Sequence, residues 1–147
     1  MSSFKVFTYG TLQSELRANH LLNTSKFLGK CKTKELFLLT CHENFIPPFL
    51  YEHGTEEGKT NIIGELYEVN DEILNVLDDL ESHPTRYYRK EIEVILKEEI
   101  FICWCYFHPK MNKVVIQDGD YKKFFQEKIP LGHKYYDISS RDNETKE

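Results

Sequence analysis

The sequence lacks both long apolar runs and clusters of basic residues. No stretch of its 147 residues approaches the roughly 18 apolar residues needed to cross a membrane. The net charge is -5 and lysine and arginine are scattered along the chain, which argues against a general affinity for nucleic acid or for anionic membranes. Because the N-terminus also lacks the apolar segment of a signal peptide, we expect a cytoplasmic protein that binds neither nucleic acid nor membrane, and we take it to be a monomer.

The common nucleotide and nucleophile motifs are missing as well. Neither G-x-G-x-x-G nor a Walker pattern occurs, which removes the usual nucleotide-binding sites. No serine or cysteine lies in a nucleophile-elbow pattern, so covalent hydrolysis has little support. The four cysteines lack the spacing of a zinc site, and we expect Cys31, Cys41, Cys103 and Cys105 to be small buried side chains rather than disulfides. Neither a metal nor another cofactor is expected.

The chain does contain enough apolar residues for one packed domain. Hydrophobic residues make up 40% of it and aromatic residues 14%, which is typical of a globular protein, and the length suits a single hydrophobic core. The last residues are polar and show no apolar period. We therefore expect one domain over residues 1–136 and a disordered tail over residues 137–147.

Alternating and apolar segments predict more strands than helices. Strands that follow one another directly along the chain favour an α+β domain built on a small mixed or antiparallel β-barrel, rather than a doubly wound parallel sheet. A hairpin is expected where residues 97–99 join two of the strands. The expected strands are residues 4–9, 34–40, 62–69, 87–96 and 100–107, and the expected helices are a short one after Ser14, residues 71–80 and residues 120–128.

The helix over residues 71–80 has recognisable ends and a recognisable apolar face. Asn70 or Asp71 is placed to cap its N-terminus, and Pro84 prevents it from continuing. Its apolar stripe consists of Ile73, Leu77 and Leu80. Ser14 is a candidate cap for the earlier short helix, which would carry Leu16, His20 and Leu21.

A first candidate site is the turn that follows the N-terminal strand, Tyr9-Gly10-Thr11-Leu12. Gly10 permits a backbone geometry that a side chain would forbid, so that successive N–H groups could converge on one point. Such a cradle near a helix N-terminus suits a carboxylate or a phosphate. The alternative is a plain strand exit with no ligand, which is the commoner meaning of such a turn.

A second candidate is Glu81, at the C-terminal end of the helix over residues 71–80. The helix dipole disfavours a negative charge there, and Asp78 and Asp79 lie close by, so we expect a raised pKa that suits a general acid/base. Arg86 or Arg89 would oppose this shift if either faced the site. The alternative is a solvated glutamate at a helix end.

Together the two segments resemble the γ-glutamyl cyclotransferase-like (AIG2-like) family. The turn over residues 9–12, the run over residues 77–84, and Tyr87 and Arg89 after it carry the resemblance, which extends from about residue 4 to residue 106. Within the family the chain is most similar to the γ-glutamylamine cyclotransferases, on the pairs Asn19-His20 and Ile46-Pro47, the run Gly64-Glu65-Leu66-Tyr67 and the run over residues 77–82. The resemblance implies a small mixed β-barrel surrounded by a few short helices, with a cavity at one end.

The resemblance also implies a reaction and roles in it. The α-amine of a γ-glutamyl group attacks its own δ-carbonyl, which closes 5-oxoproline and releases an amine such as lysine from γ-glutamyl-ε-lysine. Glu81 would move the protons without a cofactor, while backbone N–H groups of Gly10, Thr11 and Leu12 hold the α-carboxylate and Tyr9 shapes the wall. Two alternatives stay open: a cyclotransferase for γ-glutamyl amino acids or dipeptides, and a non-catalytic carboxylate-binding member of the fold.

Overall fold

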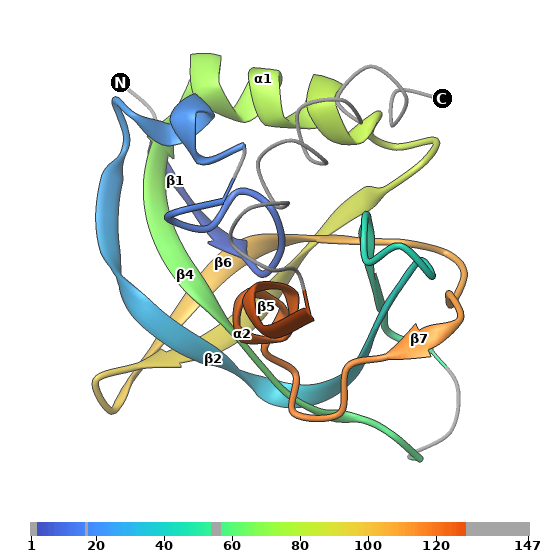
Figure 1. Cartoon of the computed structure of the whole chain (residues 1–147). Coiled ribbons are helices and arrows are strands. Elements are labelled where there is room, and N and C mark those ends of the chain that lie inside the picture. The colour runs from blue at the N-terminus through green and yellow to red at the C-terminus, as the bar shows by residue number, and fades with distance from the viewer. Residues whose placement is uncertain (1–2, 17, 54–56, 129–147) are drawn as a thin grey trace.

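A computed structural model describes residues 3–16, 18–53 and 57–128 and shows five strands closed into a barrel, with helices packed on it (Figure 1). The strands of the closed barrel follow the order β2-β4-β1-β6-β5, and β5 pairs back with β2. The strands are β1 (Ser3–Thr8), β2 (Lys26–Cys41), β3 (Pro48–Tyr51), β4 (Thr60–Asn70), β5 (Tyr88–Leu96), β6 (Glu99–Phe107) and β7 (Val114–Val115), and the helices are α1 (Asp71–Glu81), α2 (Tyr121–Lys128) and the 3-10 helix η1 (Asn19–Leu22).

The barrel is mixed because β1 runs parallel to β6, with Val6 opposite Trp104, and antiparallel to β4. The barrel closes where Lys32 and Thr33 of β2 pair with β5. Beyond this point β2 continues and pairs with the short strands β3 and β7. The architecture confirms the predicted α+β class and the mixed barrel with short helices around it.

Side chains that point into the barrel form its main core, and the four cysteines belong to this inward set. Cys31, Cys41, Cys103 and Cys105 are free and buried, as the sequence predicts. Burial raises the pKa of the Cys31, Cys41 and Cys103 thiols to about 12 and also raises the pKa of Cys105. These thiols therefore stay protonated and serve as small apolar side chains.

Helix α2 is seen nearly end-on in the middle of the barrel outline (Figure 1), and its buried residues belong to the main core. Its residues Tyr121 and Phe125 are almost fully buried, and the Tyr121 hydroxyl donates a hydrogen bond of 2.7 Å to the carbonyl oxygen of Phe45. The predicted helix over residues 120–128 is thus confirmed, and its apolar side covers one end of the barrel.

Helix α1 packs on the outside of the barrel, where a second cluster of buried side chains lies beneath it. Asn70 caps its N-terminus by accepting a hydrogen bond of 2.8 Å from the N–H of Ile73. Of the two predicted cap residues, Asn70 and Asp71, the structure thus confirms Asn70.

Of the predicted apolar stripe of α1, Leu77 is buried and Ile73 is partly buried against the same cluster, but the prediction was wrong at Leu80, which is 47% exposed. The reason is that the helix ends beside a cavity, which Leu80 lines. The buried Leu74 was not predicted.

The predicted short helix capped by Ser14 was also wrong. The chain instead makes turns around Ser14 before η1, which has Ala18 at its N-cap position and no side-chain cap. Ser14 donates its N–H and its hydroxyl to the carboxylate of Glu65, over 2.7 and 2.6 Å. Ser14 therefore binds the charged carboxylate of Glu65 on β4 and does not cap the N–H groups of a helix.

The predicted hairpin between β5 and β6 is confirmed by their antiparallel pairing from Tyr88 to Leu96. Lys97 and Glu98 form its turn with positive φ angles of 51° and 71°, as a two-residue hairpin requires. Strand β2 starts at Lys26, earlier than the predicted residue 34. The prediction missed the first half of the strand because that half is largely polar and exposed. The proposed tail over residues 137–147 lies outside the described residues, so the domain boundary stays a prediction.

In the described part of the chain, no helix is long and apolar enough to cross a membrane.

The corrected burial of α1 can be tested by a pair of leucine truncations. Leu77→Ala should lower the free energy of unfolding by about 2–5 kcal/mol, because it removes a fully buried side chain and leaves a cavity. Leu80→Ala should change it by only about 0.5 kcal/mol, as is usual at an exposed position. Urea unfolding at neutral pH measures both. Equal losses in the two variants would contradict the burial pattern of α1.

Candidate active site

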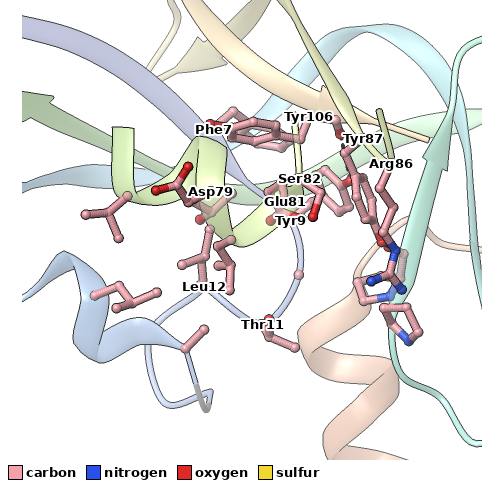
Figure 2. A pocket seen from close by; sticks show the side chains of 18 of the residues that line it. Phe7, Tyr9, Thr11, Leu12, Asp79, Glu81, Ser82, Arg86, Tyr87 and Tyr106 are labelled. Atoms are coloured by element: carbon pink, nitrogen blue, oxygen red, sulfur yellow. Dashed lines mark hydrogen bonds between the residues drawn. The ribbon is translucent and has the colours of Figure 1, made fainter. Parts of the chain in front are cut away.

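The sequence-predicted site residues meet in one cavity of about 720 Å³ at the end of α1. The C-terminal end of β1 and the turn after it form one side, and the last turn of α1 forms another. Figure 2 shows Tyr9, Thr11, Leu12 and Glu81 around the same space. All five predicted positions, Tyr9, Gly10, Thr11, Leu12 and Glu81, line this cavity. Segments some seventy residues apart in the sequence therefore share one site.

Gly10 allows the turn of residues 9–12, which we call the cradle turn, to pack closely against the loop before β3. A Cβ atom at Gly10 would lie 2.7 Å from Cγ of Pro48, and a proline ring has little freedom to move away. Pro47 and Pro48 also line the cavity. The glycine is thus required by a close approach between two segments.

The backbone of the cradle turn leaves N–H groups for a ligand. The turn is closed by hydrogen bonds from the N–H of Gln13 to the carbonyl of Gly10 and from the N–H of Ala18 to the carbonyl of Thr11, 3.1 and 3.0 Å long. The N–H groups of Gly10, Thr11 and Leu12 donate to no acceptor among residues 3–16, 18–53 and 57–128. Such N–H groups beside a cavity are suited to bind an anionic oxygen.

Glu81 is the last residue of α1, and the way the helix ends holds it at the cavity. Ser82 adopts the left-handed conformation with φ 55°. The N–H groups of Ser82 and His83 return to the carbonyls of Asp79 and Asp78, over 3.1 and 2.9 Å, which is the bonding of a Schellman motif. Figure 2 places Glu81 between Asp79 and Tyr87, and both of these residues line the same cavity.

Three tyrosines form rigid walls around Glu81. The hydroxyl of Tyr9 donates to the carbonyl of Tyr106 over 2.7 Å, and that of Tyr87 donates to the carbonyl of Pro48 over 3.0 Å. Burial, and to a smaller extent the nearby carboxylate of Glu81, raises the pKa of all three tyrosines. They are protonated at neutral pH, and their orientation is fixed by the acceptors of their hydroxyl groups.

Asp78 was predicted to raise the pKa of Glu81, but its charge is largely compensated. Arg89 binds both of its carboxylate oxygens, with distances of 2.8 and 3.0 Å, and Tyr106 donates a further hydrogen bond. Burial alone would raise the pKa of Asp78, but these hydrogen bonds outweigh it and hold the pKa below its usual value. The raised pKa of Glu81 was expected from the helix dipole, Asp78 and Asp79; it loses Asp78 as a source and stays a prediction.

The two arginines named in the sequence have different places. Arg89 stacks over the ring of Trp104 at 4.4 Å and is bound to Asp78, so it braces the last turn of α1 against β5 and β6. Arg86 lines the cavity. Tyr87, whose role the sequence left open, lines it as well.

Sequence analysis missed Tyr106, which lines the cavity and receives the hydrogen bond from Tyr9. It lies on β6 with its side chain on the opposite face from the inward cysteines. Its only local signal is an aromatic side chain on the outer face at the end of a strand, which many solvent-facing strands share.

Metal ligation has no support in the described ranges, where no three His, Cys, Asp or Glu side chains lie together as metal ligands would. The expectation that the site works without a cofactor stays a prediction.

Comparison with known proteins identifies the family of the chain. The family model described as "Gamma-glutamyl cyclotransferase, AIG2-like" matches residues 6–123, a range that includes every cavity-lining residue discussed above. The chain belongs to this family. Proteins of this family act on small γ-glutamyl substrates.

Individual relatives agree with this membership. A protein of Methanocaldococcus jannaschii, named provisionally as a γ-glutamylcyclotransferase, is 39% identical over 122 residues, which are 81% of this chain and 96% of that protein. The γ-glutamylaminecyclotransferase of the mouse, Mus musculus, is 34% identical over 99 residues, covering 63% of this chain and 64% of the mouse protein. A crystal structure of an AIG2-like protein from the mouse has a TM-score of 0.66 and 27% identity, over 73% of this chain and 78% of that one.

The bond between Asp78 and Arg89 predicts a pH-dependent loss of stability in Asp78→Asn. At pH 7 the variant should lose about 1–3 kcal/mol of unfolding free energy, because a half-buried arginine loses its charged partner. Since the pKa of Asp78 is lowered by folding, its contribution is present above the ordinary carboxyl value of 3.8 and disappears as the pH falls below it. The penalty should therefore shrink towards pH 3, as measured by urea unfolding.

Asp118→Asn is the matched control, because Asp118 is exposed and paired with Lys123 at 3.6 Å. It should have little effect at either pH. A penalty in Asp78→Asn that is the same at pH 7 and pH 3 would show that the negative charge of Asp78 does not stabilise the end of α1.

Proposed function

We propose that the protein is a γ-glutamylamine cyclotransferase, which converts a γ-glutamylamine into 5-oxoproline and a free amine, such as lysine from γ-glutamyl-ε-lysine. The observation that carries the proposal is that Glu81 and the cradle turn line one cavity in a chain of this family. The name of the mouse relative supports the choice of a γ-glutamylamine.

The cradle turn would hold the α-carboxylate of the glutamyl group. The N–H groups of Gly10, Thr11 and Leu12 offer several donors at one side of the cavity, and a carboxylate accepts such bonds in charge-assisted form. Tyr9, whose hydroxyl is held by its hydrogen bond to the carbonyl of Tyr106, would form a wall of the site. Fixing the carboxylate leaves the α-nitrogen and the δ-carbonyl of one molecule to approach each other, so the site need only select a folded conformer.

Glu81 would move the protons. The substrate enters with an α-ammonium group, which has no lone pair for attack until Glu81 accepts a proton from it. The α-nitrogen then bonds to the δ-carbon, and the bond from that carbon to the leaving nitrogen breaks. Over the whole reaction the α-nitrogen loses two protons and the leaving nitrogen gains two. One carboxylate that accepts and returns protons is therefore sufficient, with no net acid or base consumed.

The shape and lining of the cavity support an amine with an alkyl chain as leaving group. A volume of about 720 Å³ falls within the roughly 300–1,000 Å³ of small-ligand sites and leaves room beyond a glutamyl group. Apolar side chains of α1 and η1, including Val76, Leu80 and Leu21, line part of it. Lysine linked through its ε-nitrogen presents four methylene groups there, whereas an amino acid linked through its α-nitrogen presents a carboxylate next to Glu81.

Substitution of the proposed acid/base is the direct test of catalysis. Glu81→Gln should lower kcat for 5-oxoproline formation by about 10²–10⁴-fold, as is usual for loss of a general acid/base, while the urea midpoint stays close to that of the wild type. Glu72→Gln is the control, because Glu72 is an exposed carboxylate in the first turn of the same helix. Its activity should equal that of the wild type.

The same assay distinguishes a non-catalytic protein. If the wild type released no 5-oxoproline from any γ-glutamylamine, γ-glutamyl dipeptide or glutathione, the proposed reaction would be wrong. Binding of 5-oxoproline or glutamate to the wild type and to Glu81→Gln alike, without turnover, would then identify a carboxylate-binding member of the fold.

A panel of leaving groups tests the choice of amine. The value of kcat/KM for γ-glutamyl-ε-lysine should exceed that for γ-glutamyl dipeptides by at least about tenfold, because differences in apolar contact and charge of this size are typical of substrate discrimination. A preference for dipeptides would instead favour the cyclotransferase that acts on γ-glutamyl amino acids.

A further inference from the structure

Of the acidic residues that the structure describes, Glu65 alone is buried, and it does not line the cavity. It lies on β4, and its carboxylate is directed at the loop that follows the cradle turn. The N–H and the hydroxyl of Ser14 donate to its two oxygens, over 2.7 and 2.6 Å. A buried carboxylate bound twice by one loop residue fixes the position of that residue.

Tyr67 extends the same contact to the cradle turn itself. Its hydroxyl donates to Glu65 over 3.0 Å and accepts a hydrogen bond of 3.0 Å from the side-chain amide of Asn19. The same amide donates to the carbonyl oxygen of Leu12 over 2.8 Å. A chain of hydrogen bonds therefore leads from Glu65 to Leu12, which lines the cavity.

Gly64 brings β4 close enough for these contacts. A Cβ atom at Gly64 would lie 2.2 Å from the carbonyl oxygen of Thr8, the last residue of β1 before the cradle turn. Backbone cannot give way by such a distance, so a larger residue would push β1 away from β4. Gly64, Glu65 and Tyr67 thus lie on one strand segment that touches the cradle turn and the residues before and after it.

Helix α2 supplies the countercharge. Lys122 donates to the hydroxyl oxygen of Ser14 over 2.8 Å and lies 3.4 Å from Glu65. Burial raises the pKa of Glu65, but the hydrogen bonds from Ser14 and Tyr67 and the charge of Lys122 outweigh it and lower the pKa overall. Glu65 is therefore ionised at neutral pH, which strengthens each hydrogen bond that it accepts.

We propose that Glu65 is a positioning residue of the active site, which together with Tyr67 holds residues 10–16 so that the N–H groups of the cradle turn stay aimed at the α-carboxylate of the substrate. The inference rests on the proposed function of the cradle turn. The loop needs such support because it consists of turns and contains a glycine, and N–H groups that converge without a ligand repel one another.

The kinetic test is Glu65→Gln, which keeps the size of the side chain and removes its charge. If only about a tenth of the molecules then hold the cradle turn in the binding conformation, KM for the γ-glutamyl substrate rises about tenfold. Since Glu81 is untouched, kcat should stay within about threefold of the wild-type value, and its pH profile should be unchanged. Glu81→Gln should show the reverse pattern, with kcat lost.

Amide hydrogen exchange gives a second readout that does not depend on turnover. The bonds from the N–H of Gln13 to Gly10 and from the N–H of Ala18 to Thr11 close the loop, so both amides should exchange at least about tenfold faster in Glu65→Gln. The matched control is Glu52→Gln, because Glu52 is partly buried and, like Glu65, is bound by a tyrosine and a lysine, here Tyr88 and Lys90 at 2.6 Å each. Glu52 lies outside the cavity, and its variant should leave KM and both amides unchanged.

The outcomes separate this proposal from the proposed function. Wild-type exchange of Gln13 and Ala18 in Glu65→Gln would overturn the positioning role even if the enzyme is active. Absence of turnover in the wild type would overturn the function, while the exchange data would still decide whether Glu65 holds the loop. Should Glu65→Gln fail to fold, Tyr67→Phe removes only the bridging hydroxyl and must show the same changes to a smaller extent. Equal changes in Glu52→Gln would show that Glu65→Gln acts only by lowering the overall stability, which would contradict the proposal.

Discussion

The site depends on the parallel pairing of β1 with β6. Because the two strands run in the same direction, their C-terminal ends reach the same edge of the barrel. The cradle turn follows β1 and Tyr106 lies near the end of β6, so this pairing allows the hydroxyl of Tyr9 to reach the carbonyl of Tyr106. An antiparallel pair in the same position would have separated these two residues by the length of a strand.

Helix α1 completes the site because it returns from the end of β4 to the same edge. Two compensated charges stabilise this arrangement from different sides. Asp78, bound by Arg89 and Tyr106, holds the last turn of the helix on β5 and β6, whereas Glu65, bound by Ser14 and Lys122, holds the loop opposite it. Neither of these two carboxylates lines the cavity, whereas Glu81 does.

Local sequence patterns predicted those features whose causes are local. The cap at Asn70, the helix over residues 71–80 and the hairpin of β5 and β6 rest on neighbouring residues, and the structure confirms them. Predictions failed where a distant partner competed with a local signal. Ser14 was predicted to cap a helix, but Glu65 on β4 binds it instead. Leu80 was predicted to be part of the buried stripe of α1, but it is exposed because the helix extends past the surface on which it packs.

From the sequence alone came the fold class, the family and the two segments that line the cavity, because strand periodicity and short motifs are properties of contiguous residues. Only the tertiary structure decided how these segments meet. It placed Glu81 and the cradle turn on one cavity, and it assigned Asp78 to Arg89 and Glu65 to Ser14. A carboxylate has the same local sequence signal whether it is exposed, paired or directed into a cavity, and the difference comes from groups that the fold brings to it from remote parts of the chain.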